Sequence, residues 1–245
     1  MIKVVVNGAL GKMGKEVVNA VKASTDMELI QECDINNSLD NYLSKNSVDV
    51  VVDFTRPEAR MENVKTILNH GAAGVIGTTG FTDEDLEEIK KLCKKNKKGI
   101  IVAPNFAIGT ILQMHFSRIA AKYFDTAEIV EYHHNQKADF PSGTAIKTAQ
   151  LMAKERELFN PKLNDVVSNL DGARGADFKG IHIHSVRLPG MVAHQEVIFG
   201  EKGQYLTIRH DAVSRECYMS GVLMSIREVV KIDKLIYGLE SLLGL

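Results

Sequence analysis

The first hundred residues alternate short runs of β-branched residues with amphipathic stretches, and no other feature constrains the fold as strongly. Strand-like runs such as IKVVVN, VDVVVDF and GIIVAP are separated by stretches whose apolar residues recur at helical spacing. Apolar runs bounded by turns are typical of parallel strands that are covered on both faces. The pattern predicts an α/β fold, with a Rossmann-like doubly wound parallel sheet over residues 1–107. The predicted helices lie at 12–23, 38–46, 57–70 and 82–96.

From residue 108 the pattern changes to that of a second unit. Three strand-like runs, IHIHSVRL, HQEVIFG and YLTIRHDA, follow a polar, glycine-rich loop at 160–180. Strands gathered together after an α/β half indicate a second α+β domain with an open mixed sheet, which we place at 108–211. Residues 212–245 have apolar positions at helical spacing, and we expect one or two helices that pack back on the first domain. Helices are also predicted at 109–123 and 144–158, and a strand at 126–133.

Charge, cysteine content and hydropathy exclude several classes of protein. Thirty basic and thirty-one acidic residues give a net charge of −1, so no global field attracts nucleic acid or an anionic membrane. Cys33, Cys93 and Cys217 are far apart and form no Cys-x-x-Cys pair, which argues against a disulfide framework and a zinc cluster. No apolar run approaches the length that spans a bilayer, and no export signal is recognisable. We therefore expect a cytoplasmic protein without a membrane or nucleic-acid partner.

The segment VVVNGALGKMG places three glycines, Gly8, Gly11 and Gly14, between the first strand and the first helix. There a tight turn brings backbone amides and a helix amino end close to a diphosphate. The spacing is G-x-x-G-x-x-G instead of the commoner G-x-G-x-x-G, so a plain strand-to-helix turn that needs glycine for its backbone angles is the alternative. The position of the turn at the start of a βαβ run favours dinucleotide binding.

Asp34 ends the second predicted strand, twenty residues beyond the last glycine of the turn. A carboxylate there can accept hydrogen bonds from both hydroxyls of an adenine ribose, and a turn aspartate is an equally open alternative. Ile35 follows it where an arginine would bind a 2′-phosphate, although Lys12 can still reach one, so the pattern favours NADH over NADPH. The loops GTTG at 77–80 and APNF at 103–106 follow the fourth and fifth predicted strands and either line the same crevice or are simple connections.

The stretch EYHHNQKADFPSGTA gathers an acid/base pair, a cation and a helix start within fifteen residues. His133 and His134 end a predicted strand, where alternation sends adjacent side chains to opposite faces unless a loop has already begun. We expect them to have different roles, one as proton donor and the other as substrate contact. Lys137 adds a fixed cation. The hydroxyls of Ser142 and Thr144 and the first amides of the following helix form a site for an anion. The stretch predicts a site that holds a small carboxylate and protonates its neighbour, with surface histidines and a plain helix cap as the alternative.

A second histidine pair, His182 and His184, alternates along a predicted strand. Such a pair could hold a metal ion only with a third ligand. An exposed strand face is the simpler interpretation, and we predict no metal site.

The histidine stretch resembles the E-x-H-H-x-x-K-x-D-x-P-S-G-T-A signature of the dihydrodipicolinate reductase family, also called 4-hydroxy-tetrahydrodipicolinate reductase. The segments GALGKMG, VVDFTRPEA, GTTGF, PNFAIG and VSRE resemble the other blocks of that family in the same order, so the likeness spans nearly the whole chain. The resemblance implies an enzyme of diaminopimelate and lysine biosynthesis that uses NADH or NADPH. Its substrate would be the cyclic dicarboxylate made by dihydrodipicolinate synthase, reduced to tetrahydrodipicolinate with loss of water. It also implies a homotetramer built through the sheet of the second domain.

The resemblance also assigns roles to single residues. His133 would be the general acid/base, Lys137 the second catalytic group, and His134 a substrate contact. Ser142, Gly143 and Thr144 would hold a substrate carboxylate. The dinucleotide would be held by Gly8, Ala9, Leu10, Gly11, Lys12, Met13, Asp34, Gly77, Thr78, Thr79, Ala103, Pro104, Asn105 and Phe106.

The sequence departs from the family pattern at three positions. Phe140 stands where alanine is usual, Gln195 where histidine is usual, and Lys12 where arginine is frequent. Two other functions stay open, a related two-domain reductase that acts on another imine or aldehyde, and a dinucleotide-binding sensor that does not turn over. The presence of both His133 and Lys137 favours an enzyme.

Overall fold

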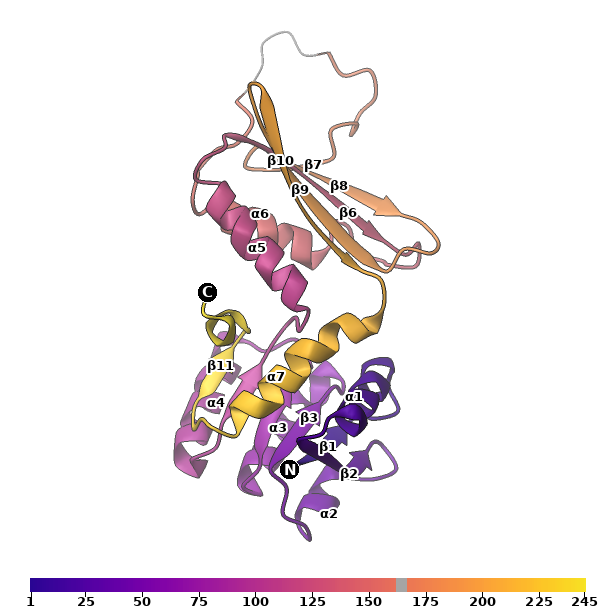
Figure 1. Ribbon diagram of the computed structural model, residues 1–245, viewed down its shortest axis with the longest axis vertical. Coiled ribbons are helices and arrows are strands. Elements are labelled where there is room, and N and C mark those ends of the chain that lie inside the picture. Colours follow the sequence, from indigo (N-terminus) through magenta and orange to yellow (C-terminus); the bar gives the residue numbers. More distant parts are fainter. Residues whose placement is uncertain (162–166) are drawn as a thin grey trace. The chain divides into compact units, whose positions relative to one another are not determined.

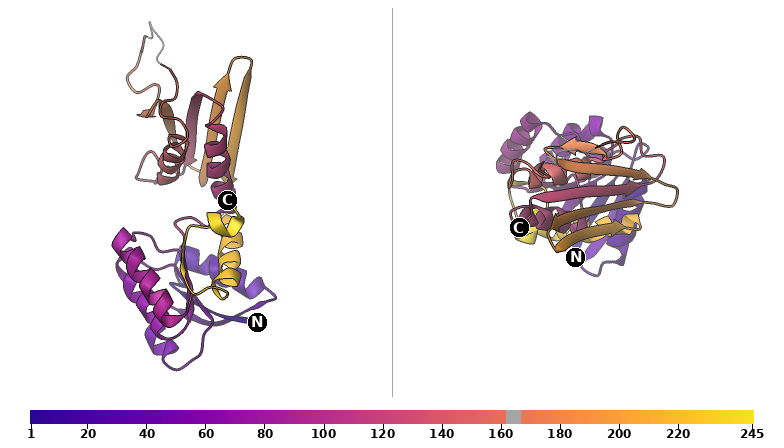
Figure 2. Two further views of the ribbon diagram at one scale, coloured as in Figure 1. Left: turned by 90° about the vertical axis from the view of Figure 1, so that its left-hand side faces the viewer. Right: turned by 90° about the horizontal axis from the view of Figure 1, so that it is seen from above.

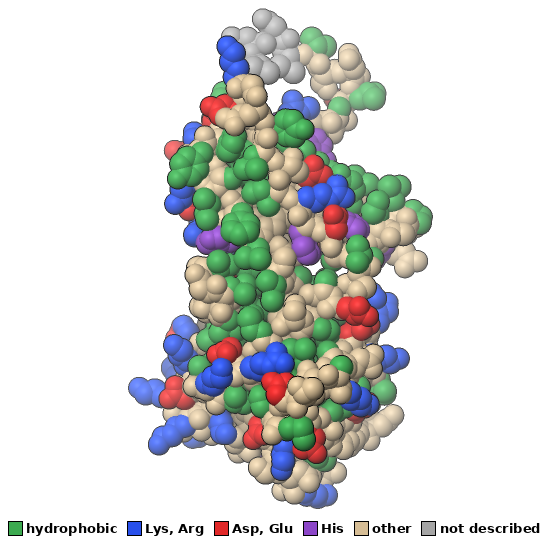
Figure 3. Space-filling view, viewed as in Figure 1, with side chains coloured by type: hydrophobic (Ala, Val, Ile, Leu, Met, Phe, Trp, Pro, Cys, Tyr) green, Lys and Arg blue, Asp and Glu red, His purple; other side chains and the backbone are tan. Residues whose placement is uncertain are grey.

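The computed structural model describes residues 1–161 and 167–245. The chain divides into two compact units, the first formed by residues 1–108 together with 215–245 and the second by residues 109–214. Both ends of the chain therefore belong to the first unit. On the face shown in Figure 3, acidic and basic side chains are interspersed, which agrees with the near-zero net charge.

The first unit contains a six-stranded sheet in which every neighbouring pair is parallel, in the order β11-β5-β4-β3-β1-β2. Its central strands are rich in valine and isoleucine residues whose side chains are buried, as expected for a sheet covered on both faces. The predicted Rossmann-like sheet is confirmed. The strands are β1 (Ile2–Asn7), β2 (Met27–Cys33), β3 (Val50–Asp53), β4 (Ala73–Ile76), β5 (Ile100–Val102) and β11 (Leu235–Tyr237).

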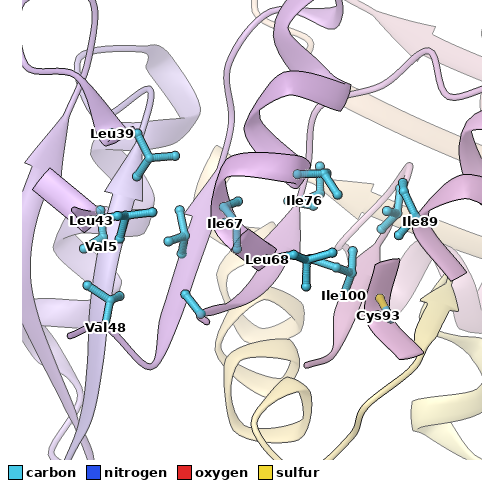
Figure 4. Packing of buried hydrophobic residues seen from close by; sticks show 14 of the residues in the cluster. Val5, Leu39, Leu43, Val48, Ile67, Leu68, Ile76, Ile89, Cys93 and Ile100 are labelled. Atoms are coloured by element: carbon cyan, nitrogen blue, oxygen red, sulfur yellow. The ribbon is translucent and has the colours of Figure 1, made fainter. Parts of the chain in front are cut away.

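Helices cover both faces of this sheet (Figures 1 and 2). One face carries α1 (Lys12–Ala23) and α7 (Met219–Val229), and the other carries α3 (Arg60–Asn69) and α4 (Asp83–Asn96). The core beneath α3 and α4 consists of aliphatic side chains from the sheet and the helices, among them Val5, Leu39, Ile67, Ile76, Ile89 and Ile100 (Figure 4). Two short elements, α2 (Leu39–Leu43) and the 3₁₀ turn η1 (Pro57–Ala59), complete this side.

The sequence predicts one or two helices over residues 212–245, but the structure also contains a strand there. The 3₁₀ turn η2 (Arg215–Tyr218) and α7 are followed by the edge strand β11 and a final turn, η3 (Glu240–Leu243). β11 pairs in parallel with β5, so Leu235 lies beside Ile100. A three-residue edge strand is too short to show a period of two, and the apolar residues around it fit helical spacing equally well.

The second unit contains a mixed five-stranded sheet in the order β10-β9-β6-β8-β7, in which only the pair β6 and β8 is parallel. The predicted α+β unit with an open mixed sheet is confirmed. Both α5 (Ile108–Ala120) and α6 (Gly143–Met152) lie on one face of the sheet (Figure 1). The strands are β6 (Thr126–His133), β7 (Ala176–Phe178), β8 (Ile181–Arg187), β9 (Ala193–Glu201) and β10 (Gln204–Ala212).

β7 lies inside the segment predicted as a polar loop at 160–180, so that prediction is wrong for its last part. Residues 162–166 of the same segment lie outside the described residues. Side chains on β6 alternate as the sequence predicts, with Ala127, Ile129 and Glu131 buried toward the helices. Among the described residues, no helix is long and apolar enough to cross a membrane.

Candidate active site

The glycine turn joins β1 to α1 and depends on the absence of side chains. Gly8 has φ +82°, and a Cβ atom there would lie 2.5 Å from the carbonyl oxygen of Phe54. The amides of Gly8 and Ala9 donate to the carbonyl oxygen of Cys33 at 3.0 and 3.1 Å. A Cβ atom on Gly14 would lie 2.0 Å from the carbonyl oxygen of Gly8, so the bare backbone lets α1 approach the turn closely.

A cavity of about 620 Å³ opens beside this turn. It lies at the carboxyl ends of β1, β2 and β3, where the strand order reverses direction and where open α/β sheets bind ligands. Asp34 contributes to its wall, and its carboxylate accepts hydrogen bonds from the amides of Leu10 (2.9 Å) and Ile35 (2.8 Å). Four of the residues predicted to bind a dinucleotide line this cavity: Gly8, Leu10, Gly11 and Asp34.

The other predicted dinucleotide residues lie outside the lining of this cavity. Ala9, Lys12 and Met13 belong to the turn and the start of α1, whereas 77–79 and 103–106 follow β4 and β5 at the same edge of the sheet. Both loops pack on Phe54, which follows β3: its ring centroid lies 5.6 Å from that of Phe106. A Cβ atom on Gly77 would lie 2.0 Å from the Phe54 ring.

A buried carboxylate that the sequence analysis misses lies beneath these loops. Asp53 ends β3 and is fully buried. It accepts hydrogen bonds from Asn7 (2.8 Å), Asn63 (2.7 Å), the Thr78 hydroxyl (2.6 Å) and both the amide and hydroxyl of Thr55. These contacts connect the carboxyl ends of β1, β3 and β4 to α3. An aspartate at the end of a wholly apolar strand is the signal that would have pointed to it.

In the second unit, β6 ends at His133, and His134 belongs to the loop that follows. His133 lies on the face of β6 that carries Glu131, and 16% of its side chain is exposed. Its Nδ1 atom lies 2.5 Å from Oε2 of Glu131. His134 is exposed, so the two histidines differ in environment. The difference arises because the strand ends between them.

Glu131 is a second carboxylate that the sequence analysis leaves without a role. Its side chain is 0% exposed and forms a two-pronged ion pair with Arg187 of β8, at 2.7 and 2.8 Å. It also accepts a hydrogen bond from the amide of Ser142 at 3.2 Å. Burial alone would raise the pKa of Glu131, but hydrogen bonds from His133 and Arg187 outweigh it and lower the pKa to about 2. Glu131 is therefore ionised at neutral pH.

The loop after His134 carries Lys137 and leads into α6. The ammonium of Lys137 lies 2.6 Å from Oδ1 of Asp139 and lowers the pKa of that carboxyl. Ser142 is the N-cap of α6, where its hydroxyl accepts from the amide of Ala145 at 3.2 Å. Gly143 is exposed, and nothing lies within 4 Å of the place a Cβ atom would take. The amino end of α6 is thus open to a ligand, and Thr144 stands beside it at the second helical position.

Two positions that depart from the family pattern have different surroundings. Phe140 is 75% exposed, between Asp139 and Pro141. Gln195 is buried on β9, directly opposite Glu131. Its amide nitrogen donates to the hydroxyl of Thr148 (2.9 Å) and to the side-chain oxygen of Gln113 (3.2 Å), which come from α6 and α5. Gln195 therefore completes a buried polar cluster between the sheet and the two helices.

The second histidine pair lies on the other face of the sheet. Nε2 of His184 lies 2.8 Å from a carboxylate oxygen of Glu128. Within residues 1–161 and 167–245, no group of three or more histidine, cysteine, aspartate or glutamate side chains is placed to hold a metal ion.

Comparisons with known proteins agree with this arrangement. Residues 2–106 match the family described as dihydrodipicolinate reductase, N-terminus, and residues 109–243 match dihydrodipicolinate reductase, C-terminus. The chain belongs to the dihydrodipicolinate reductase family. A 4-hydroxy-tetrahydrodipicolinate reductase of Listeria monocytogenes is 47% identical, over 99% of this chain and 100% of that protein. The enzyme of the same name from Dictyoglomus turgidum is also 47% identical, over 100% of this chain and 98% of that protein.

Among solved structures, a dihydrodipicolinate reductase from Paenisporosarcina sp. TG-14 with bound dipicolinate is 43% identical. The two share a TM-score of 0.91, over 98% of this chain and 99% of that one. The predicted resemblance to the dihydrodipicolinate reductase family is thus confirmed over both units.

Proposed function

We propose that this chain is an NAD(P)H-dependent oxidoreductase that reduces 4-hydroxy-tetrahydrodipicolinate to tetrahydrodipicolinate, a step of diaminopimelate and lysine biosynthesis. The observation that carries the proposal is 47% sequence identity, over 99% and 100% of this chain, to two proteins named as this reductase. The relative solved with dipicolinate supports a small cyclic dicarboxylate as the ligand. His133, Lys137 and the open amino end of α6 supply groups suited to such a ligand.

The first unit is the proposed dinucleotide-binding domain. The amides of the glycine turn and the amino end of α1 suit a diphosphate, and Asp34 in the cavity wall suits the ribose hydroxyls. The missing side chains at Gly8 and Gly11 leave the backbone accessible to the phosphates. The loops at 77–79 and 103–106 extend the same edge of the sheet toward a nicotinamide. Because Ile35 follows Asp34 and no arginine does, we infer a preference for NADH over NADPH.

The second unit is the proposed substrate-binding and oligomerisation domain. Ser142, Gly143 and Thr144 present amides and hydroxyls to a substrate carboxylate, and the exposed His134 contacts the same substrate. In the part of this unit that the structure describes, α5 and α6 cover one face of the sheet, and we assign the other face to the contacts of a homotetramer. Light scattering of the purified protein tests that assembly. Localisation in the cytoplasm is part of the same proposal.

The reaction replaces the 4-hydroxyl by hydrogen: the hydroxyl leaves with a proton as water, and the unsaturated ring that remains takes up a hydride and a proton. NAD(P)H, when bound, would supply the hydride. His133 donates the proton to the atom of the ring on which electron density develops. The positive charge of the Lys137 ammonium stabilises the negative charge that develops on the ring, and Lys137 does not compete for the proton that His133 donates. The carboxylate site at the amino end of α6 keeps the substrate ring in position during the hydride and proton transfers.

The proposal is tested by following NADH and NADPH oxidation in separate assays, with substrate made in place from pyruvate and aspartate semialdehyde by dihydrodipicolinate synthase. We expect turnover that depends on the synthase. H133Q is expected to lower kcat by about 100-fold or more, since general acid groups typically contribute at least that much. H184Q makes the same change on the other face of the sheet and is expected to leave kcat within about twofold. Coenzyme binding without any turnover would favour a sensor or a reductase of another substrate.

A further inference from the structure

The carboxylate of Glu131 is the meeting point of three parts of the proposed substrate site. Oε2 faces Nδ1 of His133 at 2.5 Å and Nη1 of Arg187 at 2.8 Å. Oε1 accepts from Nη2 of Arg187 at 2.7 Å and from the amide of Ser142 at 3.2 Å. Each oxygen therefore has two donors, and no part of the side chain is exposed to solvent. A carboxylate with this set of partners only accepts hydrogen bonds.

This arrangement fixes which nitrogen of His133 carries hydrogen. The ring nitrogen that faces a carboxylate must be a donor, so Nδ1 of His133 is protonated in both the neutral and the charged imidazole. The proton that the ring gains and loses is consequently the one on Nε2. Without the carboxylate, neutral histidine can place its single hydrogen on either nitrogen, and only one choice leaves Nε2 free to take up a proton.

Arg187 connects the same carboxylate to the loop of Lys137. Its Nη2 atom also donates to the backbone carbonyl of Asp139 at 2.9 Å, and Asp139 is the ion-pair partner of Lys137. The register between β6 and β8 places Arg187 beside His133, so the guanidinium reaches both the carboxylate and the loop. One ion pair thus sets the position of the imidazole, the lysine loop and the N-cap of α6.

We propose that Glu131 is a positioning residue for the reduction, which holds His133 in the Nδ1–H tautomer and fixes it relative to the amino end of α6. This inference rests on the proposed function. Glu131 acts through His133 and does not contact the substrate. A purely structural ion pair would contribute to stability whether or not His133 is present, and this difference separates the two roles.

A double-mutant cycle with E131Q and H133Q tests the proposal by steady-state kinetics. E131Q keeps the shape of the side chain but replaces one acceptor oxygen by a donor, which conflicts with the donors around it. We expect E131Q alone to lower kcat by about 10-fold to about 100-fold, within the range of a lost general acid. The KM for NADH, which is bound by the other unit, is expected to stay within about twofold. In the H133Q background, E131Q is expected to lower kcat by less than about threefold. An equal loss in both backgrounds would overturn the proposal.

E128Q is the matched control, because Glu128 lies on the same strand and pairs with a histidine, His184, and an arginine, Arg174. It faces the other side of the sheet, and E128Q is expected to leave kcat within about twofold. A loss as large as that of E131Q would mean that any buried or half-buried ion pair on β6 matters equally, and would contradict a specific role for Glu131.

Nitrogen-15 NMR of the wild-type ring of His133, assigned with H133Q and recorded at alkaline pH, tests the tautomer directly. We expect a protonated Nδ1 and an unprotonated Nε2. An unprotonated Nδ1 would overturn the proposal, even if E131Q does not fold. This spectrum needs no turnover, so a wild-type protein that is inactive in the coupled assay would refute the proposed function and leave the tautomer as a separate result.

Discussion

Replacement of Asp34 by alanine tests the assignment of the cavity in the first unit. Asp34 follows directly on the carboxyl end of β2, and its two oxygens already accept hydrogen bonds from the amides of Leu10 and Ile35. Each oxygen can accept a further hydrogen bond, and Asp34 lines the cavity. If an adenine ribose binds there, D34A removes the acceptor for its hydroxyls.

The expected loss follows from the strength of hydrogen bonds to a charged acceptor. One such bond contributes ~1.5–3 kcal/mol, which corresponds to an increase of about 10-fold to about 150-fold in the KM for NADH. NADPH carries a 2′-phosphate at this position, and a like charge on Asp34 opposes it. D34A removes that repulsion, so the KM for NADPH is expected to change by less than about threefold. Loss of the bond to the Leu10 amide affects both coenzymes alike and cancels in their ratio.

The measurement is the KM for each coenzyme in the coupled assay, compared between wild type and D34A. D26A is the matched control, because Asp26 stands just before β2, at the opposite end of the same strand, and pairs with Arg227 on the surface. It is expected to change neither KM. Equal increases for NADH and NADPH in D34A would refute the ribose assignment and leave Asp34 as a residue that only shapes the glycine turn.

Three further predictions concern stability. G14A is expected to lower the free energy of unfolding by ~1–3 kcal/mol in urea denaturation, because its Cβ atom would lie 2.0 Å from the backbone oxygen of Gly8 and neither helix nor turn can yield freely. T82A removes the capping box with Asp85 at the start of α4 and is expected to lower the same quantity by ~1 kcal/mol, with no change in either coenzyme KM. The pKa of Glu131 lies at about 2 instead of 4.5, so its contribution to stability is complete above pH 4.5 and is lost as pH falls through 2. Acid titration of unfolding monitored by circular dichroism is expected to show up to ~3 kcal/mol of pH-dependent stability that E131Q lacks.

The elements that could be predicted from the sequence are those that show a period and the short central strands, such as β5, that form apolar runs bounded by turns. The strand predicted at 126–133 coincides with β6, and the helix predicted at 82–96 begins one residue before α4 and ends with it. β7 and β11 have three residues each and lie at sheet edges, so their assignment depends on a neighbouring strand that the local pattern does not contain. Residues in these two segments form strands because β7 pairs with β8 and β11 pairs with β5 in the folded chain.

In the candidate site, too, only residues that lie close together in the sequence could be associated before the structure was known. His133, Lys137 and Ser142 lie within ten residues of one another, so their association is visible in the sequence. Glu131 was within reach of the same reasoning, because residues two apart on a strand share a face. Arg187 was not, because it is 56 residues further along the chain and reaches Glu131 only through the pairing of β6 with β8.

The proposed substrate site in the second unit has to hold an anion in a chain whose net charge is −1, and the fixed charges around it bear on how it would do so. Glu131 is neutralised by Arg187, and Lys137 by Asp139, so the fixed side-chain charges of the site nearly cancel. The attraction for a carboxylate would then come from the amides at the amino end of α6. The amide of the N-cap residue, Ser142, already donates to Glu131. Because Asp139 is exposed and Glu131 is buried, a ligand carboxylate can replace the first as the partner of a cation but not the second. In the proposed site, Lys137 is therefore the cation that we expect to be available to a substrate, whereas Arg187 stays with Glu131.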